Sequence, residues 1–419
     1  MPTSLKRQNL VSRSDLALYG GRPVRDKPLP FMHPGAGFID DEEIDSVVQV
    51  LKSQSLFRYY GPRFLHTTEK FEEEFARYIG VKYALAVTSG TAALHTALVG
   101  LGVEPKDEVI LPTYAWVSCP SAIIAAGGIP VLADIDDTLT LNPQDVESKI
   151  TNNTKAIMAV HIRGVACDLD ALKKICERYQ VRLLEDVAQA AGGSFHGRKL
   201  GSIGHVSSYS FQLNKMISAG EGGVVATDDE TIYERAFMFH DTATPYRRTA
   251  SSIKPFPGVN YRMNEVSSAI MRVQLRKLDG IVERLRKNKE KIKRGISDIP
   301  QISFRRIPDP EGEVAICIVF YVESAEKARE FRDALVAENI RTESGGYPGI
   351  LYDANNPRDG HVFLNWRHIL KNGELLKKRY QKSIEIMERA VHIDVSPLLT
   401  EDDIEDVIEA VHKIASAVL

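Results

Sequence analysis

Short apolar runs alternate with helical stretches from about residue 83 onward, and this alternation constrains the fold more than any other feature of the chain. The segments, in order, are ALAVTS, GTAALHTALVGL, EVILP, IPVLADI, KAIMAVHI, DLDALKKICERY, VRLLEDVAQ and SSYSFQ. Strands that alternate with helices form βαβ units, in which successive strands lie parallel. We therefore predict an α/β fold built on a mainly parallel sheet.

The segments on either side of this core predict three regions. Residues 1–36 are polar and rich in glycine and proline, which indicates an irregular N-terminal arm lying over the main body. Residues 37–285 make up the predicted large domain. Residues 286–419 combine the apolar run VAICIVFYV with helical stretches and a polar loop at 341–367, so they predict a small C-terminal α+β domain.

Apolar spacing marks several helices within these regions. One begins at Asp41, another follows the Gly61-Pro62 turn, and the last follows Thr400, which forms a capping pair with Asp403. The expected buried stripes are Ile44, Val47, Val48 and Leu51; Phe71, Phe75 and Ile79; and Ile404, Val407, Ile408, Val411 and Ile414.

The composition excludes some classes of partner. The 419 residues carry a formal net charge of -3, and no apolar run approaches the ~20 residues of a membrane span. The four cysteines are scattered, which disfavours a structural zinc site and a disulfide scaffold. The N-terminus also lacks the apolar core of a signal peptide. We therefore predict a cytoplasmic protein that binds neither nucleic acid nor membrane.

A single lysine, Lys215, stands among small and polar residues in the stretch SSYSFQLNKMISAGEGG, residues 207–223. The glycines that follow it can take positive φ angles and let the backbone approach a bound group closely. Two interpretations fit this pattern. Lys215 is either a chemical lysine in a ligand-lined turn between two strands, or a loop lysine next to a hairpin.

Two strand ends carry further candidate residues. The tetrad Ser89-Gly90-Thr91-Ala92 lies at a strand-to-helix turn, where free N–H groups and the helix dipole favour an anion such as phosphate. The strand VRLLEDVAQ ends in Asp186, with Gln189 just beyond it, and ligands of open α/β sheets lie past the carboxyl ends of strands. Helix capping is the alternative interpretation for both places.

Together these features match what one cofactor requires. A lysine amine forms a Schiff base with an aldehyde. An aspartate keeps a ring nitrogen protonated, and a helix N-terminus holds a phosphate; pyridoxal phosphate needs all three. Because the phosphate turn, the aspartate and the lysine occur in this order in one chain, we predict a pyridoxal phosphate site.

The chain resembles the sugar aminotransferase family called DegT/DnrJ/EryC1/StrS, which belongs to the fold-type-I pyridoxal phosphate enzymes. The resemblance runs from about residue 20 to the C-terminus and is most specific in YALAVTSGTAAL, EDVAQ, SFQLNK with GEGG, and GVNYRMNE. It implies a large domain with a mainly parallel seven-stranded sheet and a small C-terminal α+β domain. It also implies a homodimer with shared active sites.

The resemblance also implies roles for individual residues. Lys215 and Asp186 are the implied catalytic residues: Lys215 binds the aldehyde of the cofactor and acts as a base, and Asp186 partners the ring nitrogen. The other implied cofactor-binding residues are Gly90, Thr91 and Ser210 at the phosphate, Gln189 near the 3-oxygen, Trp116 on the ring face, and Asn260, which reaches the phosphate of the neighbouring subunit's cofactor.

Arg163 departs from the family pattern, because many relatives carry an aromatic residue at this place after the strand KAIMAV. A guanidinium grips a carboxylate through two parallel hydrogen bonds. Arg163 is therefore a candidate substrate residue, either for the donor's carboxylate or for an acidic acceptor. The alternative is a surface arginine or one paired with Asp168. The loop RTESGGYPGILYDANNP also lacks the Pro-Leu-His pattern expected of sugar-nucleotide enzymes.

These observations predict an aminotransferase that moves an amino group from glutamate or glutamine to a keto sugar, an ulosonic acid or a related polyhydroxy ketone. A cyclitol aminotransferase acting on a scyllo-inosose-type ketone is one alternative. A pyridoxamine-dependent dehydratase is disfavoured, because such relatives carry histidine in place of the lysine. A non-catalytic regulatory or binding protein on the same fold is the alternative from another class, and the intact Lys215, Asp186, Gln189 and Ser210 set argues against it.

Overall fold

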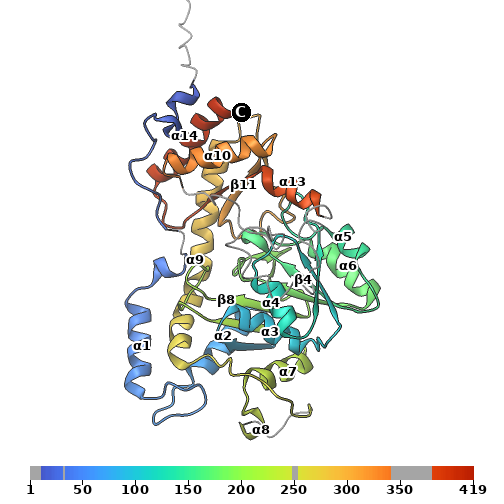
Figure 1. Ribbon diagram of the computed structural model, residues 1–419. Helices are drawn as coiled ribbons and strands as arrows, with labels where there is room; N and C mark the ends of the chain where they lie inside the picture. Colours follow the sequence, from blue (N-terminus) through green and yellow to red (C-terminus); the bar gives the residue numbers. More distant parts are fainter. Residues whose placement is uncertain (1–10, 32–33, 248–252, 341–379) are drawn as a thin grey trace, which may run out of the picture.

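Seven strands form the large sheet of the computed structural model, which describes residues 11–31, 34–247, 253–340 and 380–419 (Figure 1). The strands are β1 (Tyr83–Val87), β2 (Glu108–Pro112), β3 (Ile129–Ala133), β4 (Thr154–Val160), β5 (Arg182–Asp186), β8 (Val206–Ser210) and β9 (Gly223–Thr227). Their order across the sheet is β1-β9-β8-β5-β4-β2-β3. Neighbours from β8 to β3 are parallel, whereas β9 is antiparallel to β8 and β1. The predicted mainly parallel sheet is confirmed.

Helices pack around this sheet, as the alternating pattern requires (Figure 1). They are α1 (Asp41–Ser53), α2 (Thr67–Ile79), α3 (Gly90–Gly100), α4 (Ser118–Ala125), α5 (Pro143–Ser148), α6 (Leu169–Tyr179), α7 (Glu230–His240), α8 (Thr244–Arg247) and α9 (Glu265–Gly295). Short 3-10 helices are η1 (Arg13–Asp15), η2 (Ala17–Tyr19), η3 (Ala36–Phe38) and η4 (Ile162–Gly164), and β6 (Ser194–Phe195) pairs with β7 (Arg198–Lys199).

Helix α2 buries the stripe predicted from its sequence. Phe71, Phe75 and Ile79 are all buried. The rings of Phe71 and Phe75 meet the ring of Phe211 edge to face, at centroid distances of 5.9 and 5.8 Å. Phe211 directly follows β8, so this aromatic packing fixes the chain just before Lys215.

Helix α1 begins at Asp41 as predicted, with Asp40 as its N-cap, but its orientation differs from the expected one. Ile44 and Leu51 are 55% and 51% exposed, whereas Val50 is buried. The helix stands at the edge of the molecule and packs along α9 (Figure 1). Because one neighbouring helix covers only one side of α1, much of the predicted stripe lies on the uncovered side.

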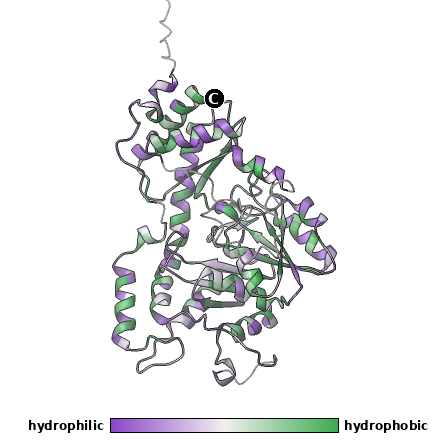
Figure 2. Ribbon diagram, in the orientation of Figure 1, coloured by the Kyte–Doolittle hydropathy of each residue, from purple (hydrophilic) through white to green (hydrophobic). Residues whose placement is uncertain are grey.

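The hydropathy of the chain follows this arrangement. Figure 2 shows the helices around the sheet carrying both hydrophilic and hydrophobic residues along their length, including α1 at the edge. This mixture is typical of helices that bury one face. Within the described residues, no helix combines the length and the hydropathy that crossing a membrane would require.

The C-terminal part contains a second sheet. Its strands β10 (Ser303–Phe304), β11 (Cys317–Tyr321) and β12 (Ala390–Asp394) are antiparallel and lie in that order. Its helices are α10 (Ala325–Ala337), α13 (Gln381–Arg389) and α14 (Glu401–Val418). Helix α14 follows the predicted Thr400–Asp403 capping box, and it buries its predicted stripe except for Ile408, which is partly buried.

Helix α9 runs from the large sheet to the C-terminal part (Figure 1). The predicted domain boundary near residue 285 falls inside this helix, and the domain limits stay predictions. The predicted polar loop at 341–367, which includes RTESGGYPGILYDANNP, lies outside the described residues.

The described part of the N-terminal arm lies against the C-terminal elements. The backbone N–H groups of Ala17 and Val24 donate to the buried carboxylate of Glu338, at 3.0 and 2.7 Å. Lys413 of α14 pairs with the same carboxylate at 2.9 Å. The Glu338 carboxylate therefore binds all three of these groups and connects the arm to α10 and α14.

A buried ion pair next to β1 generates a prediction about stability. Arg58 Nη2 donates to both carboxylate oxygens of Glu72, at 2.8 and 3.0 Å, and Glu72 also accepts the N–H of Ala86 at 2.7 Å. Arg58→Met would leave the Glu72 carboxylate buried without its cation. We expect the free energy of unfolding, measured by chemical denaturation, to fall by about 3–5 kcal/mol. Arg276→Met removes an exposed pair with Glu42 and an exposed hydrogen bond to the carbonyl of Arg272, and it should cost far less; equal losses would contradict the prediction.

Candidate active site

The candidate residues follow the carboxyl ends of five strands at one edge of the large sheet. Gly90 and Thr91 follow β1, Trp116 follows β2, Arg163 follows β4, Asp186 and Gln189 stand at the end of β5, and Ser210 and Lys215 stand at the end of β8. Strand β1 runs in the same direction as β8, because both are antiparallel to β9. These residues therefore lie along one edge of the sheet, and such an edge is where open α/β sheets bind ligands; their roles in binding and catalysis stay predictions.

The turn between β1 and α3 forms one wall of the site. Helix α3 begins at Gly90, and the side chain of Ser89 caps it by accepting the N–H of Ala92 at 3.1 Å. A Cβ added at Gly90 would lie 2.6 Å from the Cβ of Ser210, so the helix N-terminus and the end of β8 can touch only because residue 90 is glycine. The hydroxyl of Thr91 donates to Ser118 at 2.9 Å. Gly90, Thr91 and Ser210 thus lie together, and their role at a phosphate stays a prediction.

Asp186 is the last residue of β5 and is buried. Its Oδ1 accepts the N–H of Ala188 at 3.0 Å, and its Oδ2 accepts the thiol of Cys119 at 3.3 Å. Asp186 therefore fixes a turn and binds a side chain of α4 instead of capping a helix. One donor on each oxygen holds the plane of the carboxylate in a defined orientation.

The neighbouring Glu185 side chain has a structural role. It is fully buried and accepts the N–H groups of Gly201, Ile203 and Gly204 at 2.8, 2.8 and 2.6 Å. His161 Nε2 lies 3.1 Å from the same carboxylate. Burial alone would raise the pKa of Glu185, but these partners hold it below its usual value. Glu185 therefore anchors the loop behind the sheet.

Lys215 lies in the turn that connects β8 to β9. Gly220 and Gly222 take the predicted positive φ angles, 81° and 149°. A Cβ at Gly223 would lie 2.5 Å from the carbonyl oxygen of Ser89, which brings the turn against the start of α3. Burial lowers the pKa of the Lys215 amine, because it disfavours the ammonium; the nearby Asp186 opposes this shift, and Arg163 reinforces it.

Arg163 and Gln189 are joined on the other side of the site. The side-chain oxygen of Gln189 accepts the backbone N–H of Arg163 at 2.9 Å. Arg163 is buried and takes a φ of 54°, and its guanidinium donates to Asp394 of β12 at 2.6 Å. The interpretation of Arg163 as a surface arginine or a partner of Asp168 is therefore wrong: Asp168 instead caps α6 through the N–H of Ala171.

Trp116 and Asn260 are both exposed candidate residues. Trp116 is 49% exposed and stands two residues before α4. Its carbonyl accepts the N–H of Cys119, which places it close to the Asp186 contact. Asn260 is exposed, in a segment held beside the β1–α3 turn by the Thr88 N–H bond to the carbonyl of Tyr261. The roles of both residues stay predictions.

Two residues near the site were missed by sequence reasoning. Cys119 gave no signal, because a cysteine in an apolar helix is normally a small packing residue. Ser208 is buried, and within the described residues its hydroxyl has no hydrogen-bond partner. It lies on the same face of β8 as Ser210, two residues away, and pairs with Asp186 across the sheet.

These residues fit pyridoxal phosphate. The N-terminus of α3 and Ser210 supply donors for a phosphate, with no Cβ at Gly90 to fill the space between them. The hydroxyl of Ser208, which has no hydrogen-bond partner among the described residues, supplies a polar atom that a bound group can satisfy. Asp186 and Lys215, which interact electrostatically, match the charge requirements of a ring nitrogen and an aldehyde.

Comparison with known proteins gives concordant matches. The sequence model of the DegT/DnrJ/EryC1/StrS aminotransferase family matches residues 38–412. GDP-perosamine synthase of Escherichia coli O157:H7 is 34% identical over 67% of this chain and 76% of its own. A putative L-glutamine:3-amino-2,3-dideoxy-scyllo-inosose aminotransferase of Micromonospora echinospora is 36% identical over 68% of this chain and 67% of its own. The crystal structure of 3-amino-5-hydroxybenzoic acid synthase superposes with a TM-score of 0.81 at 28% identity, covering 93% of this chain and 99% of that one.

The environment of Lys215 generates a prediction about pH. A neutral amine attacks an aldehyde, so the rate at which the cofactor-free protein takes up pyridoxal phosphate rises with pH and levels off above the pKa of Lys215. Because burial and Arg163 lower that pKa, we expect the midpoint to lie below that of an ordinary lysine, near 10.4. Arg163→Gln should move the midpoint to higher pH, whereas Arg163→Lys, which keeps the charge, should move it less. Identical profiles for the two variants would show that the charge at residue 163 does not act on Lys215.

Proposed function

Because the chain belongs to the DegT/DnrJ/EryC1/StrS aminotransferase family, we propose that it moves an amino group from glutamate or glutamine to a keto sugar. Family membership makes the chain a pyridoxal phosphate-dependent aminotransferase. The observation that carries the proposal is the convergence of Lys215, Asp186 and the Gly90–Ser210 contact on one edge of the sheet. The same intact set argues against a non-catalytic regulatory or binding protein.

The cofactor, when bound, supplies an aldehyde that holds amines covalently and a protonated ring that withdraws electrons from the reacting carbon. The backbone N–H groups of Gly90 and Thr91 and the hydroxyl of Ser210 would bind its phosphate. Asp186, oriented by Ala188 and Cys119, would keep the proton on the ring nitrogen. Gln189 and Trp116 would contact the ring.

Lys215 performs the proton transfers of both half-reactions. Its amine, displaced when the donor binds, removes the proton from the donor's α-carbon. The amine would pass this proton to the cofactor, and in the second half-reaction it would take a proton from the cofactor and deliver it to the acceptor carbon. A lowered pKa suits this role, because more of the amine is neutral, and therefore basic, near neutral pH.

The pairing of Arg163 bears on the acceptor. Its guanidinium is matched by the carboxylate of Asp394 at 2.6 Å, with the side chains 8% and 11% exposed. A second carboxylate at this place would have to compete with Asp394 for the same charge. We therefore favour a neutral keto sugar or related polyhydroxy ketone over an ulosonic acid. A cyclitol ketone, which is also neutral, remains the alternative, in keeping with the similarity to the scyllo-inosose relative.

We further propose that two copies form a homodimer with shared sites. The uncovered side of α1 carries Ile44 and Leu51, two large apolar side chains that a partner subunit would bury. Asn260 is exposed beside the β1–α3 turn, where it can contact a second subunit. We also propose that the protein is cytoplasmic.

The function is tested in two half-reactions. Glutamate or glutamine should bleach the visible absorption band of the cofactor-loaded protein, and a neutral keto sugar should restore it, whereas an ulosonic acid should restore it poorly. Borohydride should label Lys215, and Lys215→Ala should lower turnover by about 10²–10⁴-fold or more, because the base is lost. A label on a different lysine, or a band that no amino donor bleaches, would refute the assignment.

Shared sites are tested by complementation. Lys215→Ala and Asn260→Ala chains are mixed and allowed to exchange subunits. If Asn260 serves the partner's phosphate, heterodimers contain one undamaged site, and activity should rise above that of either parent, to about a quarter of the wild type at equal mixing when the subunits exchange at random. Confirmed subunit exchange without a rise in activity would show that each subunit's site is self-contained.

A further inference from the structure

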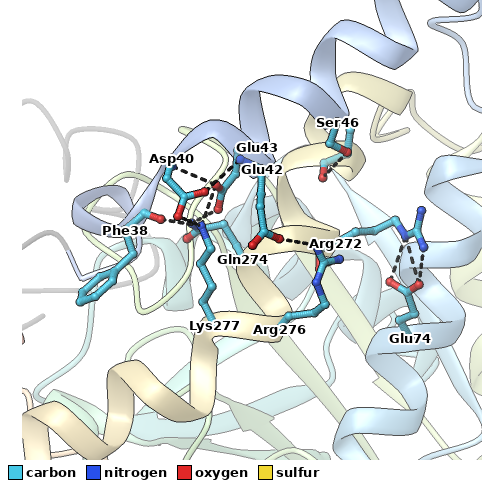
Figure 3. A network of polar contacts seen from close by, with 11 residues as sticks. Phe38, Asp40, Glu42, Glu43, Ser46, Glu74, Arg272, Gln274, Arg276 and Lys277 are labelled. Atoms are coloured by element: carbon cyan, nitrogen blue, oxygen red, sulfur yellow. Dashed lines mark hydrogen bonds and ion pairs between the residues drawn. The ribbon is translucent and has the colours of Figure 1, made fainter.

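A buried polar chain reaches the Lys215 turn from helices α1 and α9, and Figure 3 shows its Glu43, Gln274 and Lys277 side chains. Gln274 of α9 is fully buried. Its Oε1 accepts the backbone N–H of Ser218, three residues after Lys215, at 3.3 Å. Its Nε2 donates to Oε1 of Glu43 in α1 at 2.7 Å. One amide side chain thus connects the turn to a buried carboxylate on another helix.

Glu43 is itself fixed by donors on its second oxygen. Oε2 accepts the ammonium of Lys277 at 2.8 Å and the backbone N–H of Asp40 at 3.0 Å. Lys277 also donates to the carbonyl of Phe38 at 2.8 Å. Because Glu43 can only accept, the NH₂ of Gln274 must face it, and the oxygen of Gln274 must face Ser218.

Gly35 supports the same turn from the N-terminal arm. Its N–H donates to the carbonyl of Lys215 at 3.2 Å. A Cβ at this position would lie 2.6 Å from Cα of Ile217, 2.7 Å from N of Ser218 and 2.8 Å from Oε1 of Gln274. The backbone of the arm at Gly35 therefore packs directly against the backbone of the Lys215 turn. It lies next to the Ser218 N–H group that Gln274 binds.

Ser218 closes the turn upon itself. Its hydroxyl donates to the carbonyl of Phe211 at 3.0 Å and accepts the N–H of Gly220 at 3.0 Å. Phe211 and Gly220 bracket Lys215 in the sequence. A shift of Ser218 therefore moves both ends of the turn that presents the lysine.

We propose that the Glu43–Gln274 pair positions Lys215 for its reaction with the cofactor, an inference that rests on the proposed role of Lys215. Neither side chain contacts the reacting atoms, so both are positioning residues. The geometry makes the direction of the hydrogen bonds matter: Ser218 needs an acceptor, and Glu43 needs a donor. A residue that only fills space between α1 and α9 would not need this polarity.

The polarity can be tested by exchanging the two side chains. Gln274→Glu keeps an acceptor for Ser218 but sets two carboxylates against each other at the present 2.7 Å contact. Glu43→Gln can set two NH₂ groups against each other. The double variant Glu43→Gln/Gln274→Glu restores every bond: the new amide donates to the new carboxylate and still accepts from Lys277 and Asp40.

The measurements use the full-length protein with its cofactor. We expect Gln274→Glu to raise the concentration of pyridoxal phosphate needed for half-occupation by about tenfold and to shift the pH titration of the visible band. It should also slow borohydride labelling of Lys215. The double variant should return all three to within about twofold of the wild type. Arg276→Gln, which removes an exposed pair with Glu42 on the same two helices, should leave them unchanged.

The outcomes separate positioning from packing. A lowered melting temperature of Gln274→Glu with wild-type occupation, titration and labelling would overturn the proposal, and so would a double variant no better than either single one. If Gln274→Glu fails to fold, Glu43→Gln and the double variant make the same comparison. Wild-type protein that borohydride does not label at Lys215 would refute the proposed function, and this inference with it. A labelled wild type with unaffected variants would refute only the inference.

Discussion

The contact between Gly90 and Ser210 is the constraint on which the geometry of the site depends. It joins the N-terminus of α3 to the end of β8, and no other residue type fits, because a Cβ would stand 2.6 Å from the serine. The antiparallel strand β9 lies between β1 and β8, so the chain leaving β8 must return beside β1. The turn that makes this return carries Lys215, and its last glycine packs on Ser89. The order of the strands therefore brings the proposed phosphate-binding residues and Lys215 to one place.

Two adjacent acids at the end of β5 show how strand geometry divides their tasks. Successive side chains of a strand point to opposite faces. Glu185 points to one face, where backbone N–H groups and His161 satisfy it completely. Asp186 points to the other face, where Cys119 and Ala188 leave lone pairs of the carboxylate for a ligand. Identical chemistry one residue apart thus serves structure in one case and the proposed catalysis in the other.

Local patterns predicted the features that local physics determines. The strand and helix alternation, the start of α1 at Asp41, the stripe of Phe71, Phe75 and Ile79, and the glycines after Lys215 depend on short-range spacing and φ angles, and all appear where expected. The Arg163–Asp394 pair could not be predicted, because it joins residues 231 positions apart. The exposed side of α1 could not be predicted either, because periodicity identifies an apolar face and does not say what covers it. Ser208 stayed hidden because a buried serine in a strand has no distinctive pattern.

Helix α1 combines a buried polar contact on its inner side with exposed apolar residues on its outer side. Glu43 and Ile44 are adjacent, yet Glu43 points inward to Gln274 while Ile44 is exposed on the outer side. The position of α1 is set chiefly by α9, its main neighbour among the described elements. Contacts that a second subunit makes with Ile44 and Leu51 would therefore restrict the motion of Glu43 as well. Because coupling between two sites is reciprocal, a helix that supports Lys215 on one side and meets a partner on the other would make subunit association and order in the lysine turn favour each other.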